Sequence, residues 1–333
     1  MLYVHGLGHF HPENVIDNAF LESLDIGTND AWIVSRVGIR SRRTVLPLDY
    51  LRTTKNRDLR AAQEARLYTN AETGRRAALM AIERAGIRPD EVGMVIAGGC
   101  SPDTCIPAEA SSIAKALGLE VPCFDLASAC STFGAQLHFA AMMGAGLPDY
   151  VLVVIPENTT RVTDYADRSS AILFGDATAA AVVSTRHRAR VAMVASTFGG
   201  APSGADEVVI ERVGHFHQNG SAVQKFAIKR MTELLRAAQE RLPEGRRERL
   251  KYVGHQANLT MLESVTKRCE IAPERHLANI VDFGNQAAAG APVVLSQHWD
   301  AMQEGDVVAC VVVGSGLSWS GVDLVWGPAA AKA

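Results

Sequence analysis

Several segments of the chain are apolar along nearly their whole length. They are VGMVIAGG at 92–99, DYVLVVI at 149–155 and ILFGDATAAAVV at 172–183. Such strands are typical of parallel sheets whose two faces are covered by helices. A helix is predicted over 71–85, where Gly86 ends it. The pattern therefore predicts an α/β fold.

The order of elements in the first half of the chain returns in the second half. A helix predicted over 223–241 precedes the strand KYVGHQAN, as helix 71–85 precedes VGMVIAGG, and EGDVVACVVVG resembles LPDYVLVVI. The residue-by-residue match is weak, but the order agrees. We expect two similar halves, 1–185 and 186–333, with helices layered on parallel-type sheets and an exposed, helix-containing insertion near 44–70.

Cys130 stands where the apolar segment CFDLAS meets the helical pattern STFGAQLHFAAMMGAG. The free N–H groups and the positive dipole end of a helix N-terminus favour the thiolate, which is the nucleophilic form of cysteine. Cys130 is therefore a candidate for covalent catalysis. The alternative is a buried structural cysteine, which suits Cys123, Cys269 and Cys310. The helix after Cys130 is apolar on nearly all sides, so we expect it inside the protein.

Composition mainly excludes other classes of protein. The apolar runs fall short of the ~20 residues of a membrane helix, and the N-terminus lacks the pattern of a signal peptide. Six cysteines without a CxxC pair suit reduced thiols in the cytoplasm better than disulfides or a zinc site, so no metal is expected. A net charge of −3 gives no general attraction to nucleic acid or membranes.

Two further motifs follow strands of the second half. HQAN supplies His255 and Asn258, and DFGNQAAAG places Asn285 in a turn bracketed by glycines. A lone residue of this kind is usually structural. The late motif GSGLSW lacks the third glycine of a dinucleotide-binding loop, and no GxSxG elbow of a serine hydrolase occurs.

Near the N-terminus, NDAWIVSRVGIRSRR combines one large aromatic with several arginines in a setting that we expect to be rich in turns. Trp32 offers a flat face to a ring system, and Arg36 offers a planar fork to a phosphate. The alternative is a solvated basic loop.

In chain order, these motifs resemble the signatures of the thiolase-fold condensing enzymes, and specifically of β-ketoacyl-acyl-carrier-protein synthase III. DLASACSTF, FGDATAAAVV, HQAN, FGNQAAAG and GSGLSW carry the resemblance, which extends from Trp32 to about residue 326. It implies a five-layered αβαβα thiolase fold with an internal duplication, and a homodimer. It also implies an acyltransferase that performs a decarboxylating Claisen condensation of an acyl-coenzyme A with a malonyl thioester on an acyl carrier protein.

The resemblance also implies roles for single residues. Cys130 takes the acyl group, and the N–H groups of Cys130 and Gly316 form the oxyanion hole for that step. His255 and Asn285 hold the malonyl thioester carbonyl and stabilise the enolate that forms as CO₂ leaves. No cofactor is bound permanently, because coenzyme A enters as part of the substrate.

Other positions match the family's binding sites for coenzyme A, the acyl chain and the carrier protein. Trp32 and Arg161 resemble the pair that sandwiches adenine, and the remaining contacts to coenzyme A are Thr28, Arg36, Asn219 and Gly220. Ile106 matches a residue that crosses the dimer and limits acyl length. The basic positions of the carrier-protein patch are Lys225, Lys267 and Arg268, for which solvated helix charges are the alternative.

Some positions depart from the family pattern. Thr260 stands where an arginine is common, Gln224 stands where an aromatic is common, and the 44–70 stretch is longer than expected. These differences suggest a specialised member. Two other functions remain open at this point: acyl transfer from Cys130 to a hydroxyl or amine, and a non-catalytic partner subunit of an active homologue.

Overall fold

The computed structural model describes residues 1–327, so the end of the predicted second half, 328–333, lies outside the described part. Ten strands form one sheet in the order β12-β11-β13-β14-β8-β1-β7-β6-β4-β5. These strands are β1 (Leu2–Phe10), β4 (Val92–Ala97), β5 (Cys123–Asp125), β6 (Tyr150–Glu157), β7 (Ala177–Ser184), β8 (Val191–Gly200), β11 (Leu250–Gly254), β12 (His276–Leu277), β13 (Val307–Gly314) and β14 (Ser318–Trp326).

The strand order of one half of the sheet is repeated in the other. β5-β4-β6-β7-β1 corresponds to β12-β11-β13-β14-β8, and corresponding neighbours pair in the same parallel or antiparallel sense. The halves join where β1 pairs with β8, with Leu2 opposite Met193. The predicted internal duplication is confirmed. We infer that the halves divide between β7 and β8, close to the boundary that the sequence suggested.

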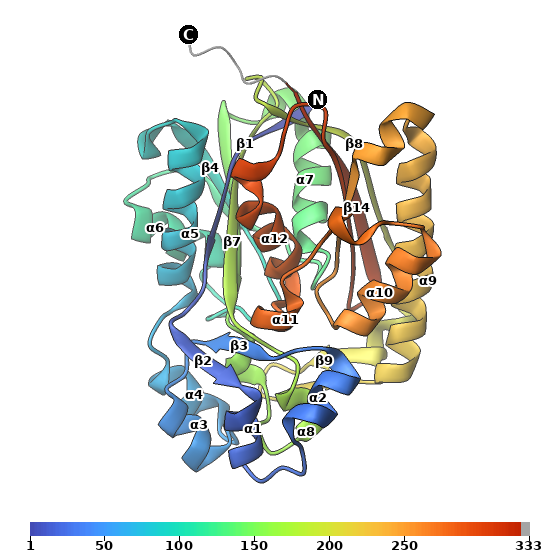
Figure 1. The fold of residues 1–333 in the computed structure, drawn as a ribbon. Helices are drawn as coiled ribbons and strands as arrows, with labels where there is room; N and C mark the ends of the chain where they lie inside the picture. The colour runs from blue at the N-terminus through green and yellow to red at the C-terminus, as the bar shows by residue number, and fades with distance from the viewer. Residues whose placement is uncertain (328–333) are drawn as a thin grey trace.

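Helices form three layers around the two halves of the sheet (Figure 1). One outer layer contains α5 (Asn70–Ala85) and α6 (Glu109–Leu117), and the other contains α9 (Gly220–Arg241) and α10 (Leu259–Arg268). Between the half-sheets lie α7 (Thr132–Met143) and α12 (Gly290–Gln297). The predicted αβαβα order is therefore confirmed. No helix within residues 1–327 is long and apolar enough to cross a membrane.

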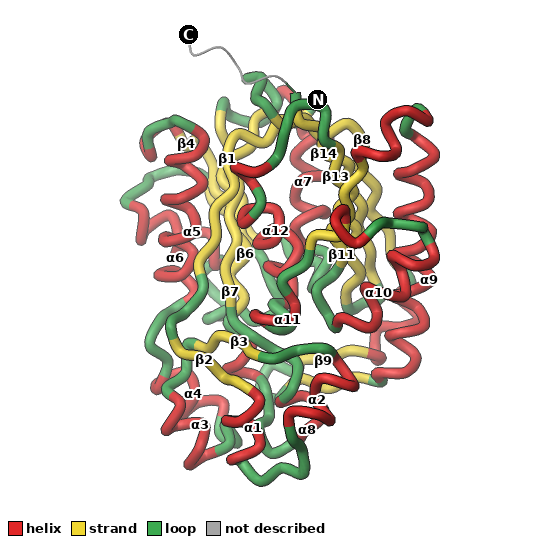
Figure 2. Tube along the Cα trace, viewed as in Figure 1, coloured by secondary structure: helices red, strands yellow, loops and turns green. Residues whose placement is uncertain are grey.

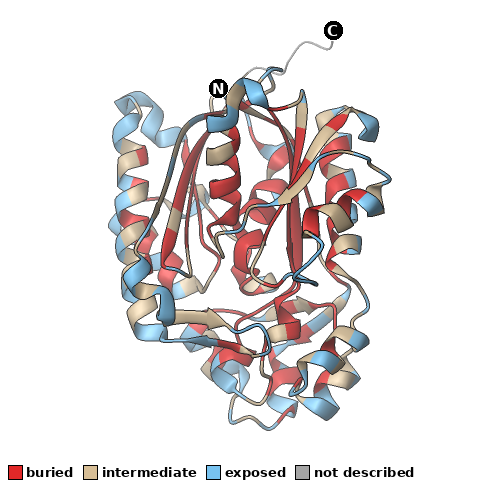
Figure 3. Ribbon diagram, turned by 180° about the vertical axis from the view of Figure 1, so that it is seen from behind, coloured by how far each residue is buried: buried red, intermediate tan, exposed pale blue. Residues whose placement is uncertain are grey.

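The central helices α7 and α12 are buried, whereas the outer helices turn an exposed face to solvent (Figure 3). Phe133 and Leu137 of α7 belong to the same core cluster as Val293 and Leu295 of α12, together with strand residues from both half-sheets. A helix with a sheet on either side has no polar face to present. This packing explains why the sequence after Cys130 is apolar on nearly all sides.

Shorter elements lie across one end of the layers, below the sheet in Figures 1 and 2. They are β2 (Asn14–Asp17), α1 (Asn18–Ser23), α2 (Asp30–Val37), β3 (Ser41–Thr44), α3 (Leu48–Thr54), α4 (Leu59–Ala65), α8 (Arg168–Ala171), β9 (Val208–Ile210), β10 (Phe216–Gln218) and α11 (Ile280–Phe283).

Two sequence-based expectations about this end differ from the structure. The segment around Trp32 is not a turn but the helix α2, because the Asn29 side chain accepts the N–H of Trp32 and caps the helix. The 44–70 stretch contains helices, as predicted, but it is not simply exposed. Asn56 is fully buried there and donates to the carbonyl oxygens of Thr160, Arg161 and Thr163.

Close contact between β1 and α5 gives a test of this packing. A Cβ on Gly8 would lie 2.0 Å from the Ala77 carbonyl oxygen and 2.6 Å from the Ala81 amide nitrogen. Gly8→Ala must push strand and helix apart, so we expect a loss of about 1 to 3 kcal/mol in the free energy of unfolding, measured by chemical denaturation. Gly146→Ala is the control, because its Cβ would meet nothing within 4 Å. Equal stability of the two variants would contradict this description.

Candidate active site

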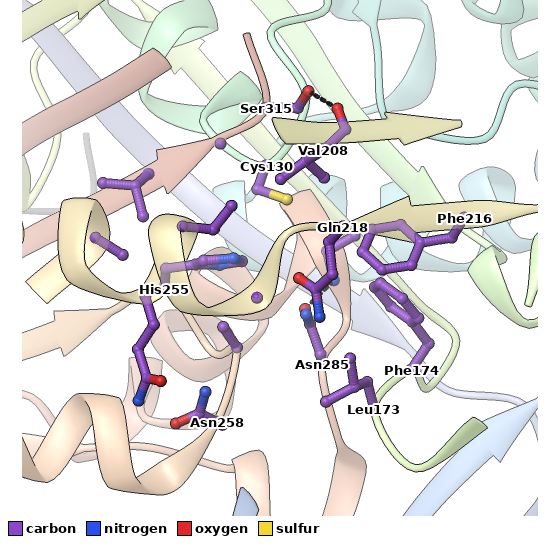
Figure 4. Close-up of a pocket in the computed structure, with 18 of the residues that line it drawn as sticks. Cys130, Leu173, Phe174, Val208, Phe216, Gln218, His255, Asn258, Asn285 and Ser315 are labelled. Carbon is purple, nitrogen blue, oxygen red and sulfur yellow. Dashed lines mark hydrogen bonds between the residues drawn. The ribbon is translucent and has the colours of Figure 1, made fainter. Parts of the chain in front are cut away.

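The predicted catalytic residues meet at the carboxyl ends of parallel strands. Cys130 follows β5, His255 follows β11 and Asn285 follows β12 and α11. In layered α/β folds, ligands bind at this end of the strands because the loops there converge. All three residues line one cavity of about 550 Å³ (Figure 4).

Cys130 lies in a tight turn just before α7. The preceding residue, Ala129, has a positive φ of 45°, and the end of β13 approaches so closely that a Cβ on Gly314 would lie 2.9 Å from the Cys130 amide nitrogen. The neighbouring Cys100 thiol and, after it, the charge of His255 hold the pKa of Cys130 well below its usual range, although burial acts in the opposite direction. These surroundings favour the thiolate form of Cys130.

His255 and Asn285 are nearly buried and face the same cavity (Figure 4). The Asn285 side-chain oxygen accepts the N–H of Ala287 at 2.9 Å, and its backbone is anchored by Leu173 and Gly175. With its oxygen used in this way, the amide presents its NH₂ group as a donor. The His255 ring lines the same cavity as Cys130, and its buried Nδ1 has no hydrogen-bond partner among the described residues. This arrangement suits stabilisation of negative charge on a bound oxygen.

The predicted oxyanion-hole glycine requires a correction. Gly316 does not line the cavity, whereas Gly314 and Ser315 do. The motif GSGLSW thus reaches the cavity through its first two residues, and Gly314 is the residue that lies against Cys130. Gly316 is not brought to the cavity, as the predicted role would require.

The predicted partner of Trp32 also requires a correction. The guanidinium of Arg168 lies 4.8 Å from the centre of the Trp32 ring, and Arg36 lies over the same ring at 5.6 Å. Arg168 is exposed and is held by the carbonyl oxygen of Gly27. These contacts place Arg168, and not Arg161, beside the tryptophan.

Arg161 belongs to a buried network of hydrogen bonds and an ion pair. Its side chain is 2 % exposed and pairs with Asp103 at 2.7 Å. It also donates to the carbonyl oxygens of Ser101 and Asn158 and to the side chain of Gln63, which belongs to the 44–70 stretch. A buried guanidinium needs such partners, so Arg161 is a structural residue and cannot stack on a ligand at the surface.

The other residues that were predicted to contact ligands do not all line the cavity that contains Cys130. Thr28 and Trp32 line a second, smaller cavity, and the buried Thr28 hydroxyl has no hydrogen-bond partner within the described residues. Gly220 lines the main cavity, whereas the adjacent Asn219 does not. Ile106 lies outside the cavity and is 85 % exposed.

The predicted carrier-protein patch is not one cluster. Lys267 and Arg268 are exposed at the end of α10, and the Arg268 backbone carbonyl accepts a hydrogen bond from Arg236 of α9. Lys225 is exposed on α9 about three helical turns before Arg236, or about 16 Å at 1.5 Å per residue. Lys225 is therefore separated from the other two basic residues.

The approach from Trp32 towards Cys130 is mainly apolar. Its walls include side chains from the loop before β7, from β9 and β10, and from α9, namely Leu173, Phe174, Val208, Phe216, Val223 and Phe226. Gln218 and Gln224 add polar groups, so Gln224 does line the channel, as expected of its position. A channel of this kind fits a long, flexible substrate arm with few polar groups.

Sequence reasoning missed two residues beside the nucleophile and one at the mouth. Cys100 follows β4 and lines the cavity, and Glu157 is fully buried at the end of β6. Neither stands in a motif with a catalytic spacing, and only the meeting of β4, β5 and β6 brings them to Cys130. Arg168 could have been found as the second arginine of the loop after β6. In residues 1–327, no three His, Cys, Asp or Glu side chains lie close enough together to hold a metal ion.

Comparison with known proteins identifies one family along the chain. A family model described as 3-oxoacyl-[acyl-carrier-protein (ACP)] synthase III matches residues 124–201, and a model of its C-terminal part matches residues 248–326. A β-ketoacyl-[acyl-carrier-protein] synthase III of Symbiobacterium thermophilum is 32% identical and covers 97% of both chains.

Solved structures agree. The 3-oxoacyl-[acyl-carrier-protein] synthase III of Aquifex aeolicus superposes with a TM-score of 0.85 at 26% identity, covering 98% of this chain and 100% of that one. The priming β-ketosynthase of the R1128 polyketide biosynthetic pathway superposes with a TM-score of 0.83 at 27% identity, covering 98% and 96% of the two chains.

Because Arg161 is buried and Arg168 is exposed, replacing each residue should change the stability of the protein by a different amount. Arg161→Ala removes the shorter ion pair of the largely buried Asp103, whose other cation, Arg66, lies at 4.0 Å, and leaves the carbonyl oxygens of Ser101 and Asn158 without this donor, so we expect a loss of about 3 kcal/mol in the free energy of unfolding. Arg168→Ala removes an exposed side chain and should cost less than about 1 kcal/mol. Urea denaturation of both variants measures the difference. Similar losses would show that Arg161 has been placed wrongly.

Proposed function

Since the chain belongs to the β-ketoacyl-[acyl-carrier-protein] synthase III family, we propose that it condenses an acyl thioester with a malonyl thioester, with loss of CO₂, through an acyl group on Cys130. The observation that carries this proposal is the meeting of Cys130, His255 and Asn285 in one cavity, where the Asn285 amide is oriented as a donor. The protein is then a transferase that forms a carbon–carbon bond.

The first half-reaction is acylation. The Cys130 thiolate attacks the carbonyl carbon of an acyl-coenzyme A, and the coenzyme A thiolate leaves and takes a proton from solvent. The oxygen of the tetrahedral intermediate carries the negative charge. Backbone N–H groups of Cys130 and of the 314–315 segment are suited to bind it, because Gly314 lies against the Cys130 amide.

The second half-reaction uses the side chains on the other side of the sulfur. The malonyl unit loses CO₂, and the electron pair of the broken bond passes into an enolate. His255 and Asn285 donate hydrogen bonds to that oxygen and stabilise its charge. The carbanion carbon then attacks the acyl group, and Cys130 leaves as a thiolate. Acyl transfer to a hydroxyl or amine would not need the Asn285 donor, which is why we favour condensation.

The mouth of the cavity supplies the site for coenzyme A. Trp32 and Arg168 are suited to hold the adenine between a flat ring and a guanidinium, Thr28 offers a hydroxyl beside them, and Arg36 attracts phosphate. The apolar channel then accommodates the pantetheine arm as far as Cys130. No permanently bound cofactor takes part in this scheme.

A homodimer and an acyl carrier protein complete the proposal. The exposed apolar side chain of Ile106 supports a contact with a second copy of the chain, in which it would limit the acyl pocket. Lys267, Arg268 and, separately, Lys225 are available to an acidic carrier protein. The cysteines are free thiols, which suits the reducing cytoplasm in which we place the reaction.

Asn285→Ala should separate the two half-reactions. It removes the donor for the enolate but leaves the backbone groups that serve acylation. We therefore expect acylation by an acyl-coenzyme A at close to the wild-type rate, while CO₂ release from a labelled malonyl thioester falls by about 10² to 10³-fold. Stopped-flow acylation and ¹⁴CO₂ release measure the two steps. Asn285→Asp should be as severe, because a carboxylate repels the enolate.

Cys130→Ala is the matched control, because it should abolish acyl labelling altogether. If the Asn285 variants released CO₂ and formed product at the wild-type rate, the enolate site would be idle and acyl transfer would replace condensation. If acyl groups appeared on another cysteine by peptide mass mapping, the nucleophile would be wrong.

If Trp32 and Arg168 hold adenine between them, the effect of replacing either residue on the Michaelis constant should depend on whether the acyl donor contains adenine. Trp32→Ala or Arg168→Ala removes one face of the clamp, and stacking or cation–π contacts are worth about 0.5 to 2 kcal/mol. The Michaelis constant for an acyl-coenzyme A should rise by about 2- to 30-fold. An acyl-pantetheine donor, which lacks adenine, serves as the control and should be affected little. Equal losses with both donors would remove the clamp from the mechanism.

A further inference from the structure

Each donor to the proposed enolate is followed in the chain by a glutamine. His255 and Asn285 line the cavity, whereas their neighbours Gln256 and Gln286 are fully buried and are not among the residues that line it. Both glutamines pack against Gly290 at the start of α12. A Cβ on this glycine would lie 3.0 Å from Cβ of Gln256 and 3.7 Å from Cβ of Gln286. The two side chains therefore lie close together, outside the cavity that the donors face.

Two backbone groups hold the Gln256 amide in one orientation. Its Nε2 donates to the carbonyl oxygen of Gly254 at 2.8 Å, and its Oε1 accepts the N–H of Asn279 at 3.1 Å. A backbone carbonyl can only accept and a backbone N–H can only donate, so these two bonds fix which end of the amide is the oxygen. Gln256 therefore joins the end of β11, immediately before His255, to the residue that begins α11.

Asn279 is in turn hydrogen-bonded to Gln286. Its Oδ1 accepts from Nε2 of Gln286 at 2.8 Å, and the same nitrogen lies 3.4 Å from the Gly284 carbonyl oxygen. The Gln286 oxygen faces His11, whose Nε2 lies at 3.0 Å and donates to it, because an amide oxygen can only accept. Burial lowers the pKa of His11 to about 4, so near neutral pH the ring is uncharged and its one N–H is the one on Nε2.

These bonds form a continuous path between the two loops that carry the enolate donors. The path runs from the end of β11 through Gln256, Asn279 and Gln286 to His11, which directly follows β1. One oxygen atom can accept from two donors only if the donors keep a fixed spacing. A displacement of about 1 Å in such a site can lower a rate by about 10²-fold. A link between the loops is therefore of direct use to the decarboxylation step.

We propose that Gln256 and Gln286 are positioning residues for decarboxylation, and that their bridge through Asn279 sets the spacing between His255 and Asn285. Neither glutamine lines the cavity, so each acts through the donor that precedes it in the chain. Acylation uses backbone N–H groups beside the nucleophile and does not depend on this spacing. The inference rests on the proposed function, because it is the enolate that needs both donors at once.

The test compares the two half-reactions in variants that lose an amide but nearly keep the size of the side chain. Gln256→Met and Gln286→Met each break the path between the loops. We expect CO₂ release from a labelled malonyl thioester, expressed per acylatable Cys130, to fall by about 10- to 100-fold. Acylation by an acyl-coenzyme A should stay close to the wild-type rate. Counting only acylatable sites removes the contribution of protein that has not folded.

A double-mutant cycle separates positioning from a general loss of structure. In an Asn285→Ala background the donor that Gln286 positions is already absent, so Gln286→Met should lower CO₂ release by less than about 3-fold further. A purely structural defect would lower the rate by the same factor in both backgrounds. Gln136→Met is the matched control, because Gln136 is also fully buried but lies on α7, outside the path. Its ratio of CO₂ release to acylation should equal that of the wild type.

His11→Phe tests the outer end of the path without removing a fully buried amide. A phenyl ring can keep the stacking on Phe283, where the two ring centres are 4.1 Å apart, but it cannot donate to Gln286. Loss of this one hydrogen bond should lower CO₂ release by about 2- to 10-fold and leave acylation unchanged. This variant decides the question if the glutamine variants do not fold.

The proposal is overturned if Gln286→Met and His11→Phe release CO₂ at the wild-type rate per acylatable site. It is also overturned if Gln286→Met costs as much in the Asn285→Ala background as it does alone. Failure of the proposed function would look different, because Asn285→Ala by itself would then release CO₂ normally. The positioning role would be lost with it in that case.

Discussion

The central constraint on this molecule is the burial of α7 and α12 between two half-sheets. A helix enclosed on both sides carries few polar side chains, because each buried polar group needs a partner, as His138 of α7 finds in Ser196 of β8 and Ser296 of α12 finds in His9 of β1. Phe133, Leu137 and Val293 meet the strands of both halves in one core cluster. Polar and ionisable groups are therefore displaced to the ends of these layers, where the loops can pair them.

The shorter elements at this end of the layers, from β2 to α4 and around α8, are held by buried polar groups. Several loops supply the partners of these groups. Asp176 is fully buried and accepts hydrogen bonds from the backbone of Val45 and from both the backbone and the hydroxyl of Thr160. Arg42, also fully buried, donates to the Ile172 carbonyl and the Asn18 side chain. Because each group is costly to leave unpaired, these contacts join the loops at this end of the layers to one another. The cavity is lined both by residues of the shorter elements, such as Trp32 and Phe216, and by residues at the strand ends, such as Cys130 and Gly314.

The duplicated topology divides the chemistry between the halves. In the mechanism that we propose, the first half supplies Cys130, with Cys100 and Glu157 at the ends of neighbouring strands, while the second half supplies His255, Asn285 and the 314–315 segment. Each set follows parallel strands of its own half-sheet. The join between β1 and β8 aligns the two sets across the central helices. The condensation that we propose draws on both sets, because Cys130, His255, Asn285 and Gly314 line one cavity.

The residue pattern alone predicted an α/β fold with two similar halves, because apolar strands and an all-apolar helix are local signals. The five-layered order and the choice of His255 and Asn285 came from motifs that resemble a known family, and the structure brings these two residues into one cavity with Cys130. The sequence could not rank Arg161 against Arg168, because spacing along a loop does not tell which guanidinium turns towards Asp103 and which towards Trp32. Nor could it reveal Cys100 and Glu157, which are separated from Cys130 along the chain and meet it only through the pairing of β4, β5 and β6. Tertiary structure decided those roles, because burial and the nearest charge determine whether a side chain supports the fold or serves the chemistry.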